Sequence, residues 1–254
     1  MFLNKDSLDE ASFREYRRTL LGSTPKHIVI DDLFDSERLN AVLDILRQEE
    51  RWQTQKHAYS ALYVNDSQWQ ASDESERFVQ RDVWQRRLPV NNQEHASNRL
   101  DATSLSDTCV AEQFLLFLRS GQFMSLLSRI FKVVITDINV ANPSINTNYF
   151  RLAPADFVKQ HADDSPSREV CMLLYLNRDW QDSSGGELVF QGLQKAGAHK
   201  GLADSVYCPV YITPKFNRCV LFDPASQGAE HWVNAIEAGS AIYRYNVTSW
   251  YWSE

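Results

Sequence analysis

The chain has 254 residues, of which 43% are hydrophobic and 12% aromatic, so it can bury a sizeable core and is not a disordered polymer. Its formal net charge of −7 provides no overall basic field for phosphate, which disfavours nucleic acid as the principal partner. The sequence holds no glycine-rich nucleotide-binding motif, no Cys-x-x-Cys pair and no long apolar run, so we expect a reduced, cytoplasmic protein without a signal peptide or membrane span.

The first part of the chain predicts one strand between two helices. A Ser-x-x-Glu capping box opens an amphipathic pattern that predicts a helix over residues 7–21. The run His27–Asp31 predicts a strand. Residues 35–48 then repeat apolar side chains at helical spacing, with Asp35 or Ser36 as the cap of the helix.

Residues 52–108 are polar and weakly patterned, with isolated aromatic side chains. Two interpretations stay open for this segment: a functional loop region or lid, or short strands and helices whose pattern is too faint to read. Helical spacing returns over residues 111–131 and predicts a helix, or a pair of helices broken near Gly121, packed on a sheet.

Beyond Val133 the chain changes to short β-rich runs separated by turn-forming residues. The predicted strands cover residues 132–141, 145–152, 170–177, 187–191, 206–213, 218–223, 230–236 and 241–252. This succession of short strands fits a jelly roll or a related double sheet. The predicted fold class is mainly β with supporting helices (α+β).

A candidate metal site begins with the tripeptide His161-Ala-Asp163, which ends a strand-like run. Residues two apart on a strand point to the same face, so both side chains can reach one ion. His231 follows a later strand and turn and supplies a second imidazole. Two imidazoles and one carboxylate make the facial triad of non-haem Fe(II). His199 competes for the third place, but its polar turn is more typical of a solvated loop histidine.

A basic side chain follows on the last predicted strand. Strand alternation places Arg244, Asn246, Thr248 and Trp250 on one face of it. A buried guanidinium on a sheet needs an anionic partner, and its planar fork matches a carboxylate. A dicarboxylic acid bound beside the metal could provide that partner.

The order of these residues resembles the 2-oxoglutarate and Fe(II)-dependent dioxygenases, specifically their prolyl 4-hydroxylase-like branch. The particular elements are Tyr-Leu-Asn-x-x-Trp at 175–180, Gly-Gly-Glu-Leu at 185–188 and Arg-x-x-x-Thr-x-Trp at 244–250. The resemblance covers residues 145–252 closely and the preceding part of the chain less well. It implies a double-stranded β-helix (jelly-roll, cupin-like) core within a single domain, 1–254. Residues 1–131 would form the N-terminal strand, helices and polar lid region, and residues 132–254 the catalytic core.

The resemblance also implies roles for individual residues. It assigns the iron ligands to His161, Asp163 and His231, and the salt bridge to the far carboxylate of 2-oxoglutarate to Arg244. Tyr175 and Thr248 match positions that hydrogen-bond the same carboxylate, and Tyr149 matches a tyrosine near the keto-acid end of the cosubstrate. Trp250 would form a pocket wall, and Arg168 would face the substrate entrance.

The activity implied is hydroxylation of an unactivated C–H bond with Fe(II), 2-oxoglutarate and O2, releasing succinate and CO2, with ascorbate as a candidate reductant. We expect a prolyl residue in a peptide or protein as substrate, ahead of a free amino acid or another small metabolite. Two other classes stay open: a non-catalytic jelly-roll binding protein, which the intact triad disfavours, and a nucleic-acid demethylase, which the negative charge disfavours. The sequence leaves the oligomeric state open.

Overall fold

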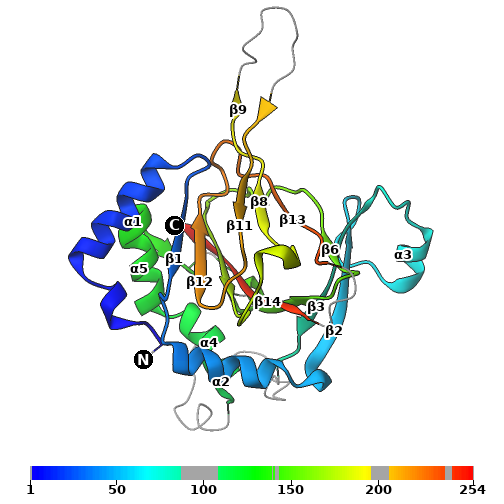
Figure 1. Cartoon of the computed structure of the whole chain (residues 1–254), viewed down its shortest axis with the longest axis horizontal. Coiled ribbons are helices and arrows are strands. Elements are labelled where there is room, and N and C mark those ends of the chain that lie inside the picture. Colours follow the sequence, from blue (N-terminus) through cyan, green and yellow to red (C-terminus); the bar gives the residue numbers. More distant parts are fainter. Residues whose placement is uncertain are drawn as a thin grey trace, which may run out of the picture.

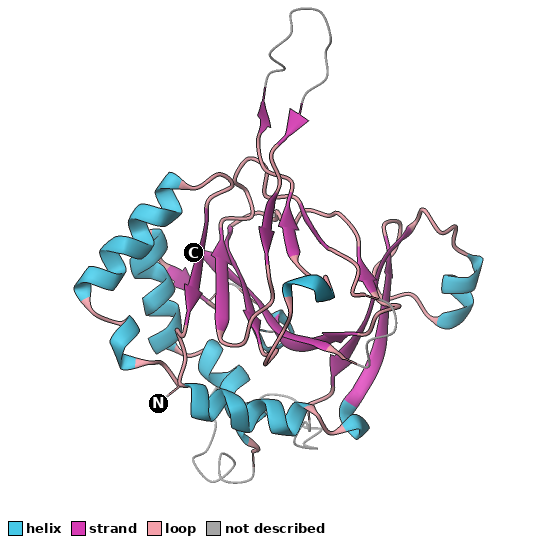
Figure 2. Ribbon diagram, viewed as in Figure 1, coloured by secondary structure: helices cyan, strands magenta, loops and turns pink. Residues whose placement is uncertain are grey.

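The structure is a computed structural model that describes residues 2–86, 108–138, 140, 143–195, 206–237 and 242–253. Strands make up the centre of the molecule and most helices lie along one side of it (Figures 1 and 2). The helices are α1 (Glu10–Gly22), α2 (Ser36–Leu46), α3 (Asp66–Ala71), α4 (Val110–Leu118) and α5 (Gly121–Phe131), with short 3-10 helices η1 (Lys5–Ser7), η2 (Glu49–Arg51), η3 (Pro143–Asn146) and η4 (Asp182–Ser184).

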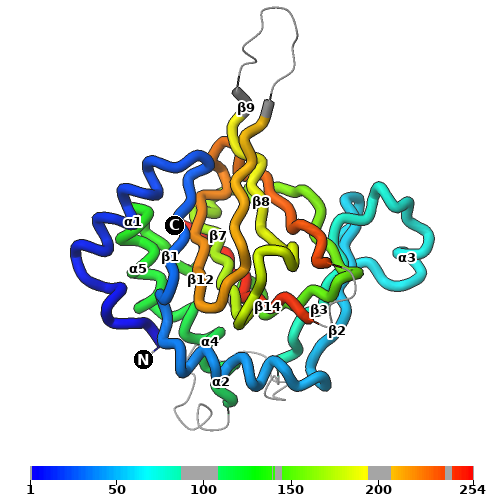
Figure 3. Tube along the Cα trace, in the orientation of Figure 1, coloured from blue at the N-terminus to red at the C-terminus, as the bar shows by residue number. Residues whose placement is uncertain are grey.

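A large antiparallel sheet forms the framework. Its strand order is β1 (His27–Asp31), β12 (Arg218–Phe222), β7 (Arg168–Tyr175), β14 (Arg244–Ser253), β5 (Thr147–Leu152), β3 (Arg77–Trp84) and β2 (Trp52–Ala58), with β4 (Ile135–Thr136) paired to β14 and β6 (Phe157–Val158) paired to β3. The strand β1, from the start of the chain, lies beside β12, from its last quarter (Figure 3).

A second sheet faces the large one and closes the jelly roll. It consists of β11 (Val210–Ile212), β8 (Leu188–Phe190) and β13 (His231–Val233). A separate pair, β9 (Gln194–Lys195) and β10 (Val206–Tyr207), projects from the body of the fold (Figure 1). Apolar side chains from β7, β8 and β12 fill the space between the two sheets. The predicted class, mainly β with supporting helices on a jelly-roll core, is confirmed.

The other face of the large sheet is covered by helices α1, α2, α4 and α5 (Figure 1). Helices α2, α4 and α5 bury apolar side chains at helical spacing, such as Leu39, Val42 and Leu46 of α2. These side chains pack with strand residues such as Leu174 and Val247 in one core cluster, so the first and second halves of the chain share a core.

Short-range features of the sequence predicted most of the helix ends. Asp35 caps α2 by accepting a hydrogen bond from the Arg38 amide at 2.9 Å, and the predicted break near Gly121 separates α4 from α5. The first helix begins later than predicted, at Glu10, because the carboxylate of Asp9 accepts from the Ser12 amide at 2.6 Å. The Ser-x-x-Glu signal had suggested a start at residue 7.

The polar segment 52–108 contains regular structure over its described part. Residues 52–84 form β2, α3 and β3, which supports the second of the two interpretations. Three aromatic residues of this segment, Tyr63, Trp69 and Trp84, differ in where their side chains lie. Only Tyr63 lines the central pocket, whereas Trp69 is buried beneath Arg77 and Trp84 is buried against Tyr149.

Candidate metal centre and its pocket

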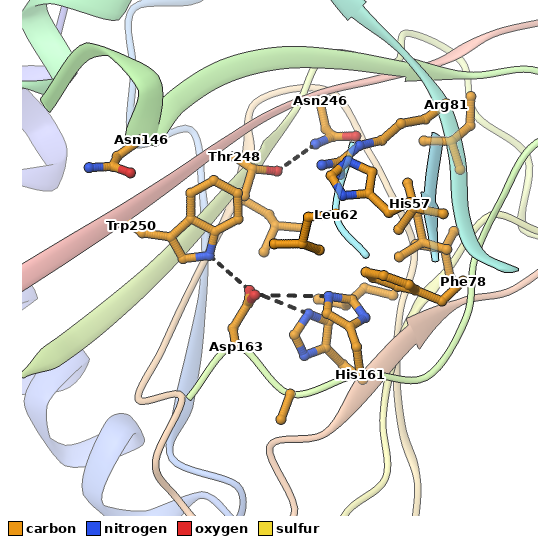
Figure 4. A pocket seen from close by; sticks show the side chains of 18 of the residues that line it. His57, Leu62, Phe78, Arg81, Asn146, His161, Asp163, Asn246, Thr248 and Trp250 are labelled. Carbon is orange, nitrogen blue, oxygen red and sulfur yellow. Dashed lines mark hydrogen bonds and ion pairs between the residues drawn. The ribbon is translucent and has the colours of Figure 1, made fainter. Parts of the chain in front are cut away.

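The three predicted metal ligands lie together at one end of the jelly roll. His161 follows β6, His231 begins β13, and their backbones exchange two hydrogen bonds of 3.0 Å. This bridge brings their ring centroids to 4.4 Å. Asp163 faces both rings, with its oxygens 3.9 Å from Nε2 of His161 and 3.7 Å from Nε2 of His231 (Figure 4). One ligand atom from each of the three residues lies within 4.8 Å of the others.

The backbone fixes which nitrogen each imidazole offers. Nδ1 of His161 lies 2.9 Å from the Lys159 carbonyl, and Nδ1 of His231 lies 3.0 Å from the Ala229 carbonyl. A carbonyl oxygen only accepts, so both Nδ1 atoms donate and both Nε2 atoms keep their lone pairs. These lone pairs face Asp163, which is the tautomer that a metal ligand requires.

Burial and neighbouring charges set the protonation states of His231 and Asp163. Burial, followed by the neighbouring His161, lowers the pKa of His231 to about 4, so this ring is neutral at pH 7. Burial would raise the pKa of Asp163, but the two histidines, the Trp250 hydrogen bond and Arg168 together lower it. The cluster therefore presents a neutral His231 imidazole beside an ionised Asp163 carboxylate.

Two side chains hold the carboxylate in place. The Trp250 indole Nε1 donates to Asp163 Oδ2 at 2.9 Å, as Figure 4 shows. Arg168 donates to the backbone carbonyl of Asp163, and its guanidinium lies 3.8 Å from Oδ1. Trp250 thus does more than form the predicted pocket wall, and Arg168 contacts the metal ligand directly as well as lining the pocket.

The cluster opens into a cavity of about 540 Å³ between the two sheets. Arg244 lines this cavity and is 1% exposed. Its Nε donates to the Gly186 carbonyl at 2.7 Å, and its Nη1 donates to Asn246 Oδ1 at 2.9 Å. Gly186 has φ +73°, and a Cβ there would lie 3.2 Å from Cδ of Arg244. The Gly-Gly pair of the sequence thus gives the guanidinium the space it needs.

Two buried donors at this end have no partner in the part of the chain that the structure describes. They are Nη2 of Arg244 and the hydroxyl of Tyr175, whose ring centroid lies 4.9 Å from the Arg244 guanidinium carbon. An unpaired buried donor costs about 1–3 kcal/mol, so the pair calls for an acceptor that the chain does not supply. A carboxylate offers the right geometry to a guanidinium fork.

The part of the chain that holds this site is similar to a known protein family. Residues 147–252 match the model of the 2OG-Fe(II) oxygenase superfamily. These residues belong to that superfamily. This match and the fold support an enzyme, a 2-oxoglutarate and Fe(II)-dependent dioxygenase with a prolyl hydroxylase-like fold, and the family implies Fe(II), 2-oxoglutarate and O2. The resemblance drawn from the sequence is confirmed. No curated protein matches the chain.

Solved structures share the fold at low sequence identity. A prolyl hydroxylase from Trichoplax adhaerens, in complex with a peptide fragment of the hypoxia inducible factor oxygen degradation domain, has 18% identity and a TM-score of 0.57, covering 98% of this chain and 96% of that one. A 2OG-Fe(II) oxygenase family oxidoreductase from Burkholderia pseudomallei has 16% identity and a TM-score of 0.56, with coverage of 96% and 92%. The alpha-ketoglutarate-dependent epimerase SnoN of nogalamycin biosynthesis has 9% identity and a TM-score of 0.53, with coverage of 96% and 82%. The three descriptions differ in reaction, so the shared fold does not select a substrate.

The residues of the site fit the cofactors that the family implies. The His-Asp-His cluster matches an iron site that leaves positions open for other ligands. The unpaired donors of Arg244 and Tyr175 match a carboxylate of 2-oxoglutarate. Thr248 also lines the pocket, where its Oγ1 accepts from Asn246 Nδ2 at 3.0 Å, which leaves the hydroxyl proton free to donate.

Tyr149 does not lie where the sequence resemblance placed it. It is paired with Val247 across β5 and β14, and therefore points to the helical side of the sheet, away from Arg244 and Asn246. Its hydroxyl donates to the Ala111 carbonyl at 2.9 Å, and the ring is fully buried. Tyr149 is therefore a core residue, and the prediction that it contacts 2-oxoglutarate is wrong.

The sequence analysis did not predict several of the residues that line the pocket, among them two basic side chains. His57 and Arg81 come from β2 and β3, in the weakly patterned segment, and both line the cavity (Figure 4). Strand alternation around Arg81 was too faint to show which side chains face inward. His199, the competing metal ligand, lies outside the described residues.

Proposed function

We propose that the protein is a hydroxylase that couples oxidation of 2-oxoglutarate to oxidation of a C–H bond in a second substrate. Substrate, 2-oxoglutarate and O2 would give hydroxylated substrate, succinate and CO2. One oxygen atom enters the new hydroxyl group and the other enters succinate. Decarboxylation of the keto acid supplies two of the four electrons that reduce O2, and the C–H bond supplies the other two.

The observation that carries this proposal is the pair of unpaired donors on Arg244 and Tyr175 in the cavity that also holds the His-Asp-His cluster. We assign iron binding to His161, Asp163 and His231. Arg244, Tyr175 and Thr248 would hold the far carboxylate of 2-oxoglutarate. Bound Fe(II) supplies the redox chemistry with O2 at a face left open by three protein ligands.

The chain itself orients the site and keeps it dry. Trp250 and Arg168 fix the Asp163 carboxylate. Leu173 and Leu188 line the same cavity as Arg244. Apolar walls exclude water, which strengthens the attraction between a guanidinium and a carboxylate. Both histidines use Nδ1 for a backbone carbonyl, so Nε2 of each is the nitrogen that would bind a cation beside the Asp163 carboxylate.

For the second substrate we propose a prolyl residue in a peptide or protein. The family branch supports this choice, and one structural neighbour is described as a prolyl hydroxylase holding a peptide. The cavity mouth also carries apolar side chains that a peptide could contact: Tyr59, Leu62 and Tyr63 are 52%, 64% and 71% exposed. Hydroxylation of a free amino acid is the alternative.

An anaerobic titration with Fe(II) and 2-oxoglutarate, followed by a succinate assay in air, tests the proposal. We expect joint binding and slow succinate release even without the second substrate, and release stimulated by prolyl peptides. His161→Ala and Asp163→Ala should lose both metal binding and turnover. A wild-type protein that binds neither ligand would favour the non-catalytic jelly-roll protein instead.

The same assay tests the distal ligand and the substrate class. His231→Ala should be inactive and His199→Ala active; the reverse result would transfer the ligand role to His199. Stimulation by small metabolites but not by prolyl peptides or cell-extract proteins would replace the peptide proposal with its alternative.

We further propose a cytoplasmic location and a stimulating effect of ascorbate. All four cysteines are free, which suits a reducing compartment. No described helix is both long and apolar enough to cross a bilayer. Cell fractionation checks the location, and repeated turnover with and without ascorbate checks its role.

A further inference from the structure

One wall of the cavity carries polar groups that neither the metal nor 2-oxoglutarate accounts for. Strands β2 and β3 pair with Gln55 opposite Arg81 and His57 opposite Val79. Directly opposed residues and residues two apart share a face, so all four side chains lie on one face of this strand pair. His57, Val79 and Arg81 line the cavity, which identifies that face as its wall (Figure 4).

Arg81 is held rigidly but its charge is not neutralised. Its Nε donates to Gln55 Oε1 at 3.2 Å, and its guanidinium carbon lies 3.5 Å from the centroid of the Phe150 ring. Among the described residues no carboxylate forms an ion pair with it, unlike Arg168, which lies 3.8 Å from Asp163. Burial lowers its pKa only to about 10, so the side chain is a cation at neutral pH. A guanidinium held in this way, with no hydrogen bond from its terminal nitrogens to the described residues, is suited to bind an anion.

His57 provides a second unpaired group beside it. The side chain is 6% exposed, and its Nε2 has no hydrogen-bond partner among the described residues. Its ring packs against Tyr63, 4.6 Å away between centroids, and against Phe78 at 5.7 Å. Figure 4 shows His57 next to Arg81, on the side of the cavity away from Asp163. This buried polar atom is available to pair with a ligand in the cavity.

The charges of the cavity point to the sign of that ligand. Among the described residues, the ionised side chains that line it are the cations Arg81, Arg168 and Arg244 and the anion Asp163. Fe(II) and the 2-oxoglutarate dianion would cancel each other, and the wall residues would leave the cavity positive. A further anion removes part of this excess, because like charges in a poorly solvated cavity repel strongly.

We propose that Arg81 and His57 bind a carboxylate of the second substrate. The inference rests on the proposed function, because it assigns 2-oxoglutarate to Arg244. The carboxylate has two sources in the proposed substrate class: the terminal carboxylate of an amino acid or peptide, or the side chain of an acidic residue next to the target. Both would pair with the Arg81 fork while the target C–H bond lies toward the metal ligands.

The test measures binding instead of turnover, so it stays readable if hydroxylation fails. Protein loaded with redox-inert Zn(II) and saturating 2-oxoglutarate is titrated calorimetrically with N-acetyl amino acids and their amides. A second set pairs N-acetyl-Asp-Pro-amide with N-acetyl-Asn-Pro-amide. The first set tests whether the protein recognises a terminal carboxylate, and the second tests whether it recognises an acidic side chain.

We expect an acid in at least one set to bind tenfold or more tightly than its neutral partner. In Arg81→Gln the ratio of the two affinities, acid to neutral partner, should fall to near one. Charge-assisted hydrogen bonds contribute about 1.5–3 kcal/mol, or roughly 10- to 100-fold in affinity. Arg81→Lys should restore part of the ratio. Arg18→Gln removes the same charge from an exposed helix position, 78% exposed at the side chain, and should leave the ratio unchanged.

Three results would overturn the inference: acids and amides that bind equally to the wild type, no binding of either, or an unchanged ratio in a folded Arg81→Gln protein. Lack of succinate formation in the separate turnover assay would reject the proposed function alone. Tight binding of an acid other than proline would reject the prolyl substrate but keep the carboxylate site.

Discussion

Trp250 offers a sharp test of how the metal centre is built. Its indole Nε1 donates to Asp163 Oδ2 at 2.9 Å, so the bond orients a carboxylate that would ligate iron. Trp250→Phe keeps an aromatic side chain at the wall and removes the donor. Hydrogen bonds to charged groups contribute about 1.5–3 kcal/mol. If this hydrogen bond stabilises the metal-bound protein and not the metal-free protein, its loss should lower the Fe(II) affinity about 10- to 100-fold.

The assay is an anaerobic Fe(II) titration, paired with thermal unfolding of the metal-free protein to separate binding from folding. Trp252→Phe is the matched control. The guanidinium carbon of Arg168 lies 5.0 Å from the Trp252 ring and 5.6 Å from the Trp250 ring, but only Trp250 donates to Asp163. Equal affinities for wild type and Trp250→Phe, or equal losses in both variants, would refute this account of the carboxylate.

Three further predictions concern 2-oxoglutarate, the core and pH. Arg244→Lys keeps the charge but loses the fork, so the KM for 2-oxoglutarate should rise roughly 10- to 100-fold; a fall in thermal stability alone would make Arg244 structural. Tyr149→Phe should leave that KM unchanged and lower the free energy of unfolding by about 0.5–1.5 kcal/mol, because it loses only the bond to Ala111. The hydrogen bond from Arg218 lowers the pKa of Asp31 below 3.8. The ionised Asp31 therefore stabilises the folded protein above pH 3.8, and this contribution is lost as the pH falls through the lowered pKa. Urea unfolding of Asp31→Asn should therefore show a deficit of about 0.2–1 kcal/mol at pH 7 that shrinks as the pH falls through the lowered pKa, and a constant deficit would exclude this linkage.

Short-range chemistry in the sequence was sufficient to place several elements and most of the site. The strand His27–Asp31 and the cap Asp35 follow from residues that interact within a few positions of one another. The His161-x-Asp163 spacing places both groups on one face through the two-residue period of an extended chain. The alternation Arg244, Asn246, Thr248 and Trp250 predicted a shared face, and all four residues line the cavity.

Only the tertiary structure decided which distant strands meet and which face of each one points inward. Alternation alone cannot tell that Tyr149 opposes Val247 and points to the helices, whereas Tyr175 opposes Asn246 and lies beside Arg244. Arg81 likewise becomes a pocket residue only because β3 joins the large sheet next to β5. Strand register and the packing of two sheets depend on contacts between residues far apart in sequence, and a shift of one residue would turn every side chain to the opposite face.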